Sequence, residues 1–185
     1  MKKFISLLLL SLTLALALTA CGQTISDEDA IAIVKDRIIA SYALNEIYFG
    51  EGLPTEEYED NGEAIQYVNV SSDSPYHTVD AIKMATEDVY SPRVCGNLYA
   101  NAFTGFNDGQ VIVYARYIEQ YGILTANVKY STIKTTEDYD LSSVKVIENK
   151  KNYVVFEILK KDGSVGTVEI TLSGDGRWTL NTLTY

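Results

Sequence analysis

Hydrophobic residues recur at helical spacing from Asp27 to Tyr48, and this pattern predicts one long amphipathic helix. Ser26 is a suitable N-cap, and Asp29 follows three residues later, where an acidic side chain complements a helix start. Gly50 and Gly52 follow the last apolar position and predict the end of the helix.

Two shorter helices are predicted between residues 78 and 105. Thr78 is the expected N-cap of the first. Ser91 followed by Pro92 begins the second, because proline is favoured at the first helical position. Gly105 ends this helical section.

After Gln110 the hydrophobic period changes to two, which predicts strands. Turn signals separate these strands, and Asp162-Gly163 is the strongest hairpin pair. The expected strands are 64–70, 111–116, 123–130, 144–148, 153–159, 165–172 and 178–185. Because most strands follow the helices, we expect an α+β fold with N-terminal helices packed on a curved antiparallel sheet.

The first twenty residues have the composition of an export signal. Lys2 and Lys3 precede an apolar run from Phe4 to Ala20. Leu18-Thr19-Ala20-Cys21 resembles the lipobox of bacterial lipoproteins. The resemblance implies cleavage after Ala20 and a diacylglycerol on Cys21, with acyl chains that hold the protein to the membrane. The alternative is an uncleaved helix anchor, for which the apolar run is marginal in length.

This division makes residues 1–20 a lipoprotein signal peptide, 21–25 a lipidated tether and 26–185 a single α+β domain. Loss of the two signal lysines leaves 13 basic against 25 acidic residues, so the net charge falls from −10 to −12. A surface with this much negative charge repels the phosphate backbone of nucleic acids, so we expect no nucleic acid partner. The expected location is the extracytoplasmic side of the cell membrane.

The last strand, Asp175-Gly176-Arg177-Trp178-Thr179-Leu180-Asn181-Thr182-Leu183-Thr184-Tyr185, resembles the cystatin-like and NTF2-like family of extracytoplasmic lipoproteins. Val89-Tyr90-Ser91 and the stretch 115–124 are similar to parts of the secreted inhibitors of cell-wall DL-endopeptidases. The first resemblance implies a cone-shaped fold of helix and sheet. The second implies binding to a wall hydrolase.

Catalytic motifs are absent from the sequence, which contains no P-loop, GxSxG, HExxH or paired CxxC. Cys95 and His77 stand on neighbouring segments, and as nucleophile and base they would make a thiol enzyme. The competing interpretation is a packed cysteine and a surface histidine. The acidic segment 56–63 lacks the spacing of a calcium loop, and we expect no metal or cofactor.

Tyrosine is unusually frequent, with 14 residues against 5 phenylalanines. Tyr114, Tyr117, Tyr121 and Tyr130 fall in one predicted hairpin with Arg116 among them. Tyrosine suits binding surfaces because it buries area and keeps a hydroxyl for hydrogen bonding. This hairpin is therefore the candidate surface for a peptide, glycan or protein. The competing interpretation is the ordinary preference of half-exposed strands for tyrosine.

Together these patterns favour a non-catalytic binding or regulatory lipoprotein whose partner is a protein or cell-wall component, with a wall hydrolase as the concrete case. The first alternative is a small hydrolase or isomerase with its pocket inside an NTF2-like cone. The second is a purely structural envelope lipoprotein. A sheet interior filled with Val, Ile and Phe would argue against the first alternative, because it leaves no room for a substrate.

Overall fold

The computed structural model describes residues 24–107, 112–132 and 138–185. The signal segment 1–20, the lipidation residue Cys21 and Val111 of a predicted strand lie outside the described residues. The elements in chain order are α2 (Asp27–Tyr48), β1 (Tyr67–Asn69), α3 (Val79–Val89), α4 (Pro92–Tyr99), the π-helix η2 (Ala100–Thr104), β2 (Phe106–Asn107), β3 (Ile112–Val113), β4 (Tyr117–Gln120), β5 (Ile123–Asn127), the 3₁₀ turn η3 (Leu141–Ser143), β6 (Lys145–Asn149), β7 (Tyr153–Leu159), β8 (Val165–Leu172) and β9 (Trp178–Leu180).

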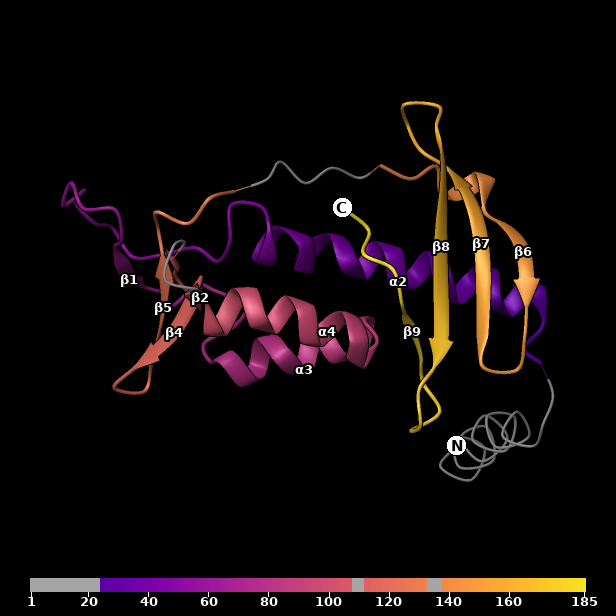
Figure 1. Ribbon diagram of the computed structural model, residues 1–185, viewed down its shortest axis with the longest axis horizontal. Helices are drawn as coiled ribbons and strands as arrows, with labels where there is room; N and C mark the ends of the chain where they lie inside the picture. The colour runs from indigo at the N-terminus through magenta and orange to yellow at the C-terminus, as the bar shows by residue number, and fades with distance from the viewer. Residues whose placement is uncertain (1–23, 108–111, 133–137) are drawn as a thin grey trace, which may run out of the picture.

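Helix α2 runs along the molecule and links its two ends (Figure 1). Its bounds, Asp27–Tyr48, are those that the sequence predicts. The Ser26 hydroxyl accepts a hydrogen bond from the Asp29 backbone N–H at 3.1 Å and donates to its carboxylate at 2.7 Å, which forms the expected N-cap. With 22 residues, the helix is roughly 33 Å long.

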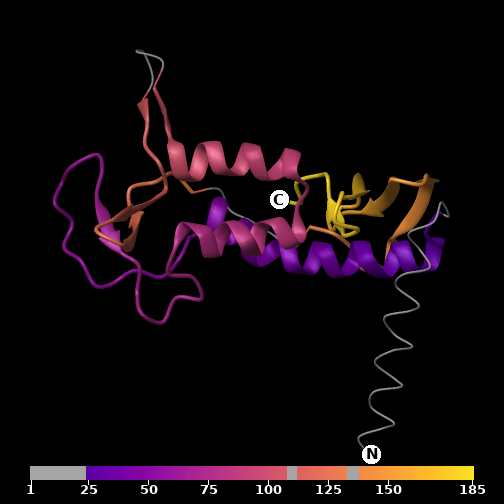
Figure 2. The ribbon, with the colours of Figure 1, turned by 90° about the horizontal axis from the view of Figure 1, so that it is seen from below.

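A four-stranded antiparallel sheet, in the order β6-β7-β8-β9, lies beside the first half of α2, whose axis runs across the strands (Figures 1 and 2). One face of its two central strands is fully buried, through Val154, Phe156, Ile158, Val168 and Ile170. These side chains share a hydrophobic core cluster with Ala30, Val34 and Ile38 of α2. The alternation of buried and less buried residues along these strands therefore places one face in the core.

A separate three-stranded sheet, in the order β1-β5-β4, lies at the other end of α2, near the short ribbon β2-β3 (Figure 1). Its hairpin turns at Tyr121 and Gly122, whose φ angles are 53° and 81°. Two successive left-handed residues are what a two-residue type I′ hairpin requires, and glycine at the second position meets this requirement without strain. The strands differ from those predicted. β5 ends at Asn127 and β1 begins at Tyr67, so both are shorter. The expected strand 111–116 is wrong, because the partner of β5 is β4 (Tyr117–Gln120), and only Ile112–Val113 of the expected range is a strand among the described residues.

Helices α3 and α4 complete the middle of the molecule (Figure 2). The Thr78 hydroxyl accepts from the Ala81 backbone N–H at 3.0 Å, and the Ser91 hydroxyl accepts from that of Val94 at 3.4 Å. Both predicted N-caps are confirmed. The Ser91 backbone N–H also donates to the Leu180 carbonyl at 2.8 Å, which ties the helices to β9.

The mixed α+β class is confirmed, but the strands do not form the single sheet that we expected. Strands are spaced about 4.8 Å apart, so four strands cover about half of a helix roughly 33 Å long. The second half of α2 is left to α3, α4 and the separate sheet.

The last predicted strand, 178–185, is also too long, because β9 ends at Leu180. The chain then turns towards α2, where the fully buried Thr184 receives a hydrogen bond at Oγ1 from Asn45 Nδ2 at 3.1 Å. Ser41 Oγ lies 2.5 Å from the same hydroxyl. A buried hydroxyl needs hydrogen-bond partners. Ser41 and Asn45 of α2 supply them to Thr184, which a longer β9 would hold away from the helix.

Candidate functional site

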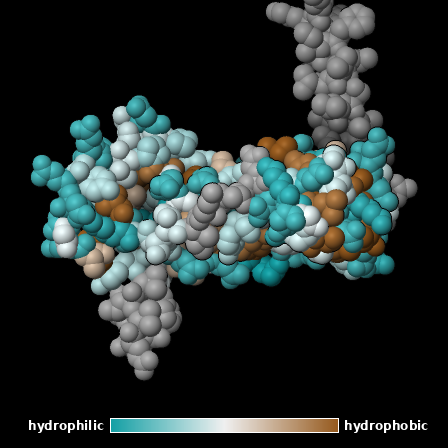
Figure 3. Space-filling view, turned by 90° about the horizontal axis from the view of Figure 1, so that it is seen from above, coloured by the Kyte–Doolittle hydropathy of each residue, from teal (hydrophilic) through white to brown (hydrophobic). Residues whose placement is uncertain are grey.

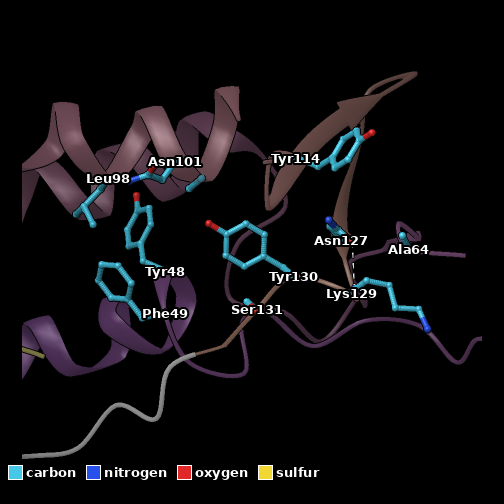
Figure 4. A pocket seen from close by; sticks show the side chains of 11 residues that line it. Tyr48, Phe49, Ala64, Leu98, Asn101, Tyr114, Asn127, Lys129, Tyr130 and Ser131 are labelled. Carbon is cyan, nitrogen blue, oxygen red and sulfur yellow. Dashed lines mark hydrogen bonds between the residues drawn. The ribbon is translucent and has the colours of Figure 1, made fainter. Parts of the chain in front are cut away.

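A cavity of about 420 Å³ lies where the end of α2, the α4–η2 helix and the β1-β5-β4 sheet meet (Figure 4). This size is within the range of small-molecule sites. The wall is largely apolar and aromatic, with a few amides and hydroxyls and one amine. It is formed by Tyr48, Phe49, Ala64, Leu98, Asn101, Ala102, Tyr114, Asn127, Lys129, Tyr130 and Ser131.

Tyr48 forms a rigid part of this wall. Thr86 Oγ1 donates to the Ile82 carbonyl at 2.7 Å, so it can only accept in its 2.8 Å contact with the Tyr48 hydroxyl. Tyr48 is therefore the donor. Burial raises the pKa of Tyr48 far above its ordinary value, which keeps the phenol neutral at physiological pH.

Arg116 is buried behind the cavity, with 3% of its surface exposed. Its guanidinium donates to the carbonyls of Tyr48 at 3.1 Å and Gly50 at 2.5 Å, at the C-terminal end of α2. A cation is favourable there because the last carbonyls of a helix carry partial negative charge. The guanidinium also lies over the ring of Tyr130, 5.1 Å from its centroid.

The glycine that follows α2 makes this approach possible. Gly52 has a φ of 87°, and a Cβ there would lie 2.6 Å from Arg116 Nη2 and 2.8 Å from the Tyr117 hydroxyl. Both the backbone conformation and the close contact exclude a larger residue. Gly52, just beyond the end of α2, was therefore the sequence signal that buried side chains, here Arg116 and Tyr117, pack against this turn.

Tyr117 is fully buried and holds the same junction. Its hydroxyl donates to the Ile47 carbonyl at 2.9 Å and accepts from the Leu53 backbone N–H at 3.0 Å. Burial raises the pKa of the Tyr117 phenol, so it remains a neutral hydrogen-bonding group. Arg116 and Tyr117 therefore close the end of α2 and offer no surface to a partner.

The remaining tyrosines of the predicted surface are separated. Tyr114 and Tyr130 line the cavity, and Tyr130 points from the strand side towards Tyr48 (Figure 4). Tyr121 lies at the tip of the β4–β5 hairpin and is fully exposed. The structure thus brings two of the five predicted residues to the cavity, places two behind it and leaves one outside.

Two asparagines and a lysine of the wall were missed by the sequence argument. Asn127 is only 7% exposed, and its Oδ1 accepts a hydrogen bond from the Lys129 backbone N–H at 3.1 Å (Figure 4). The Lys129 amine points away from the helices and pairs with Asp60 at 2.5 Å, which ties the acidic loop to the sheet. Asn101 comes from η2. No sequence motif marks these positions.

Cys95 and His77 do not resemble a catalytic pair. Cys95 is buried, and its Sγ donates to the Tyr90 carbonyl at 3.4 Å. Burial raises the pKa of this thiol, which disfavours the nucleophilic thiolate. His77 is exposed in a loop, and neither residue lines the cavity. Within the described ranges, no group of three His, Cys, Asp or Glu side chains is placed to hold a metal ion.

The comparisons with known proteins add no relative. In the described part of the chain, no helix is both long and apolar enough to cross a membrane. No protein-family model matches the sequence, and no curated protein is significantly similar to it.

Proposed function

We propose that this chain is a membrane-anchored extracytoplasmic lipoprotein whose folded domain is a non-catalytic binding or regulatory module. The observation that carries this proposal is the cavity at the far end of α2. Its described lining contains phenols, amides, apolar side chains, a serine and the Lys129 amine, and no carboxylate, histidine or cysteine is among these described residues. The Lys129 amine is paired with Asp60, and burial keeps the Tyr48 phenol neutral, so these groups are poorly placed for general acid–base chemistry and the wall is better suited to holding a ligand.

The position of the tether supports an anchored orientation. Asn149 Nδ2, at the end of β6, donates to the Ile25 carbonyl at 2.9 Å and to the Asp27 carboxylate at 2.6 Å. The chain is therefore held to the four-stranded sheet from Ile25 onward. A lipid on Cys21 would keep this sheet near the bilayer, while the cavity lies at the opposite end of α2, roughly 30 Å away.

The proposed partner is a cell-wall component or a wall hydrolase, following the resemblance of 89–91 and 115–124 to endopeptidase inhibitors. We also propose the kinship with cystatin-like and NTF2-like domains. Its support is the α2 and β6–β9 half, where one long helix lies across an antiparallel sheet (Figure 1). The face of β7 and β8 that shares a core with α2 is filled by Val, Ile and Phe side chains, which argues against an enzyme pocket in that half.

Anchoring is tested by metabolic labelling with a fatty acid followed by membrane fractionation. We expect the full chain to carry the label and to sediment with membranes. Cys21→Ser should lose the label and become soluble, whereas Cys95→Ser, which changes the other cysteine, should remain labelled. An unlabelled, soluble parent chain would contradict the anchor.

Binding is tested with the mature chain carrying Cys21→Ser. It is mixed with purified peptidoglycan, and separately with a wall hydrolase whose rate is followed. We expect sedimentation with the wall or a change in rate. Tyr130→Ala, inside the cavity, should abolish the effect, and Tyr121→Ala, at the tip of the β4–β5 hairpin and outside the cavity, should not. The absence of both effects with correctly folded protein contradicts the proposal.

A further inference from the structure

Residues 181–185 form a strap that leads from the four-stranded sheet towards the cavity end of α2 (Figure 1). The strap begins on the sheet, where the Asn181 backbone N–H donates to the Glu169 carbonyl at 2.8 Å. At its other end, the ring of Tyr185 stacks on that of Phe49, with centroids 4.1 Å apart and an angle of 29° between the planes. Phe49 lines the cavity. The strap therefore connects the sheet to one ring of the cavity wall.

Thr184 is held in place by buried hydrogen bonds whose directions are fixed. The Ser41 hydroxyl donates to the Ile38 carbonyl at 2.6 Å, so it accepts from the Thr184 hydroxyl in their 2.5 Å contact. Asn45 Nδ2 donates to Thr184 Oγ1 at 3.1 Å and to the Thr184 carbonyl at 3.2 Å. Ser41, Asn45 and Thr184 are each at most 2% exposed. Satisfied buried networks favour a single arrangement, so the strap has a defined position against α2.

Tyr185 differs from its buried neighbour in the strap. Its side chain is 44% exposed, it lies outside the hydrophobic core cluster, and it does not line the cavity. A residue whose role is to stabilise the fold would be buried more deeply. The contact that distinguishes Tyr185 is the stack on Phe49, a geometry in which two aromatic rings attract beyond the area that they bury.

Phe49 is a part of the wall that its own helix does not fix. It is the C-cap of α2, where φ of −128° has left the helical range. Its backbone N–H still donates to the Asn45 carbonyl at 2.7 Å, so the backbone is held and the ring is not. The neighbouring ring of Tyr48 is fixed by its hydrogen bond to Thr86. A phenyl ring has no such group, so only packing can orient it.

We propose that Tyr185 is a positioning residue of the binding cavity, which acts by holding the ring of Phe49 as a preformed part of the wall. A ligand then meets a surface that is already ordered, and less side-chain freedom is lost on binding. The strap supplies the second half of this arrangement, because Thr184 fixes where Tyr185 stands. This inference rests on the proposed binding function and assigns a role to a residue outside the cavity.

The position of the Phe49 ring is measured directly by NMR in the mature chain carrying Cys21→Ser. Tyr185→Leu removes the stacked ring and keeps an apolar side chain. We expect the Phe49 ring signals to move downfield, because a stacked ring shields the protons over its face, and the NOEs between Phe49 and Tyr48 to weaken. Tyr185→Phe keeps the ring and should preserve both. Tyr121→Leu, at the exposed hairpin tip, is the control and should change neither.

Binding is then compared by titrating the same variants with peptidoglycan and with the wall hydrolase. Tyr185→Leu should weaken binding by about two- to tenfold, which corresponds to the cost of ordering one side chain. Tyr185→Phe should restore the affinity of the parent chain. Melting temperatures should stay close to that of the parent, because the side chain is half exposed. A merely structural role would lower stability and affinity together.

Thr184→Val tests the strap itself. The change keeps the shape of the side chain but removes the hydroxyl that Ser41 and Asn45 bind. We expect a lower melting temperature, because buried partners lose their hydrogen bonds, together with the same downfield movement of the Phe49 signals. Phe49 signals that stay in place in this variant would contradict the role of the strap.

Unchanged Phe49 signals in Tyr185→Leu, or equal losses in Tyr185→Leu and Tyr185→Phe, would overturn the positioning role. The broader function fails separately. If the parent chain binds the wall or the hydrolase and Tyr185→Leu binds equally well, the function stands and the positioning role falls. If the parent binds neither, the proposed function falls, and the Phe49 signals still decide whether Tyr185 positions the ring.

Discussion

The two ends of α2 are stabilised in different ways. At the first half, fully buried Val, Ile and Phe side chains of β7 and β8 share a core with the helix. At the other end, the side chains of buried Arg116 and Tyr117 form hydrogen bonds with the last carbonyls of α2 and with the backbone just after it. Dense apolar packing leaves little space, whereas polar groups that reach across a junction can frame a cavity. The sheet end therefore has the packing of a scaffold, and the cavity lies at the other end.

The surfaces of the two ends differ as well. Figure 3 shows a mostly hydrophilic face with hydrophobic residues gathered over the sheet end. Exposed Leu159 and Val165 are cross-strand partners there. On the cavity end, Tyr121 at the hairpin tip is fully exposed, and Tyr58, Tyr114 and Ile123 are exposed as well.

The largest expected effect is at the sheet end. Phe156→Ala removes a fully buried ring from the centre of β7 and should lower the free energy of unfolding by about 3–5 kcal/mol. Urea denaturation measures this loss. Leu159→Ala, on the exposed face of the same strand, is the control and should change stability by less than about 1 kcal/mol. Similar losses in both would contradict the described packing.

A smaller loss is expected at the cavity end. Arg116→Met leaves the carbonyls of Tyr48 and Gly50 without their donor and should destabilise the fold by about 2 kcal/mol. Hydrogen exchange should quicken at Leu53 but not at Val154, because the damage is local. Arg177→Met is the control, since Arg177 forms exposed ion pairs with Asp88 and Asp175. If Arg116→Met had no effect, the polar junction would not stabilise this end.

The smallest effect concerns the turn between β8 and β9. Hydrogen bonds from Ser173 and Arg177 lower the pKa of Asp175 to about 2. In the unfolded chain the pKa of this carboxyl lies near its ordinary value of 3.8, so the ionised form favours the fold. Its contribution is present above about pH 4 and is lost as pH falls through about 2.

An NMR titration of the Asp175 carboxyl and melts between pH 5 and 2 measure this contribution. In Asp175→Asn, the loss of stability between pH 5 and 2 should become only slightly smaller, because the group is exposed. An Asp175 pKa near 4 would show that the turn is not held by these bonds.

The local patterns were informative wherever one face of an element is buried. The bounds of α2, the caps at Ser26, Thr78 and Ser91, and the later hairpins followed from periodicity and turn residues. Arg116 shows where this reasoning fails. Alternation in a strand makes a charged residue appear exposed, but the unpaired carbonyls at the end of α2 draw this one inside.

The sequence by itself determined the helices, most turns, the acidic charge and the expectation of a lipid-bearing Cys21, because these depend on neighbouring residues or on composition. The tertiary structure alone decided that the strands divide between two ends of one helix. It also decided which tyrosines reach a cavity and which way Asn127 and Asn101 turn their amides. These features depend on contacts between residues distant in the chain or on one backbone donor. A local sequence pattern predicts neither of these.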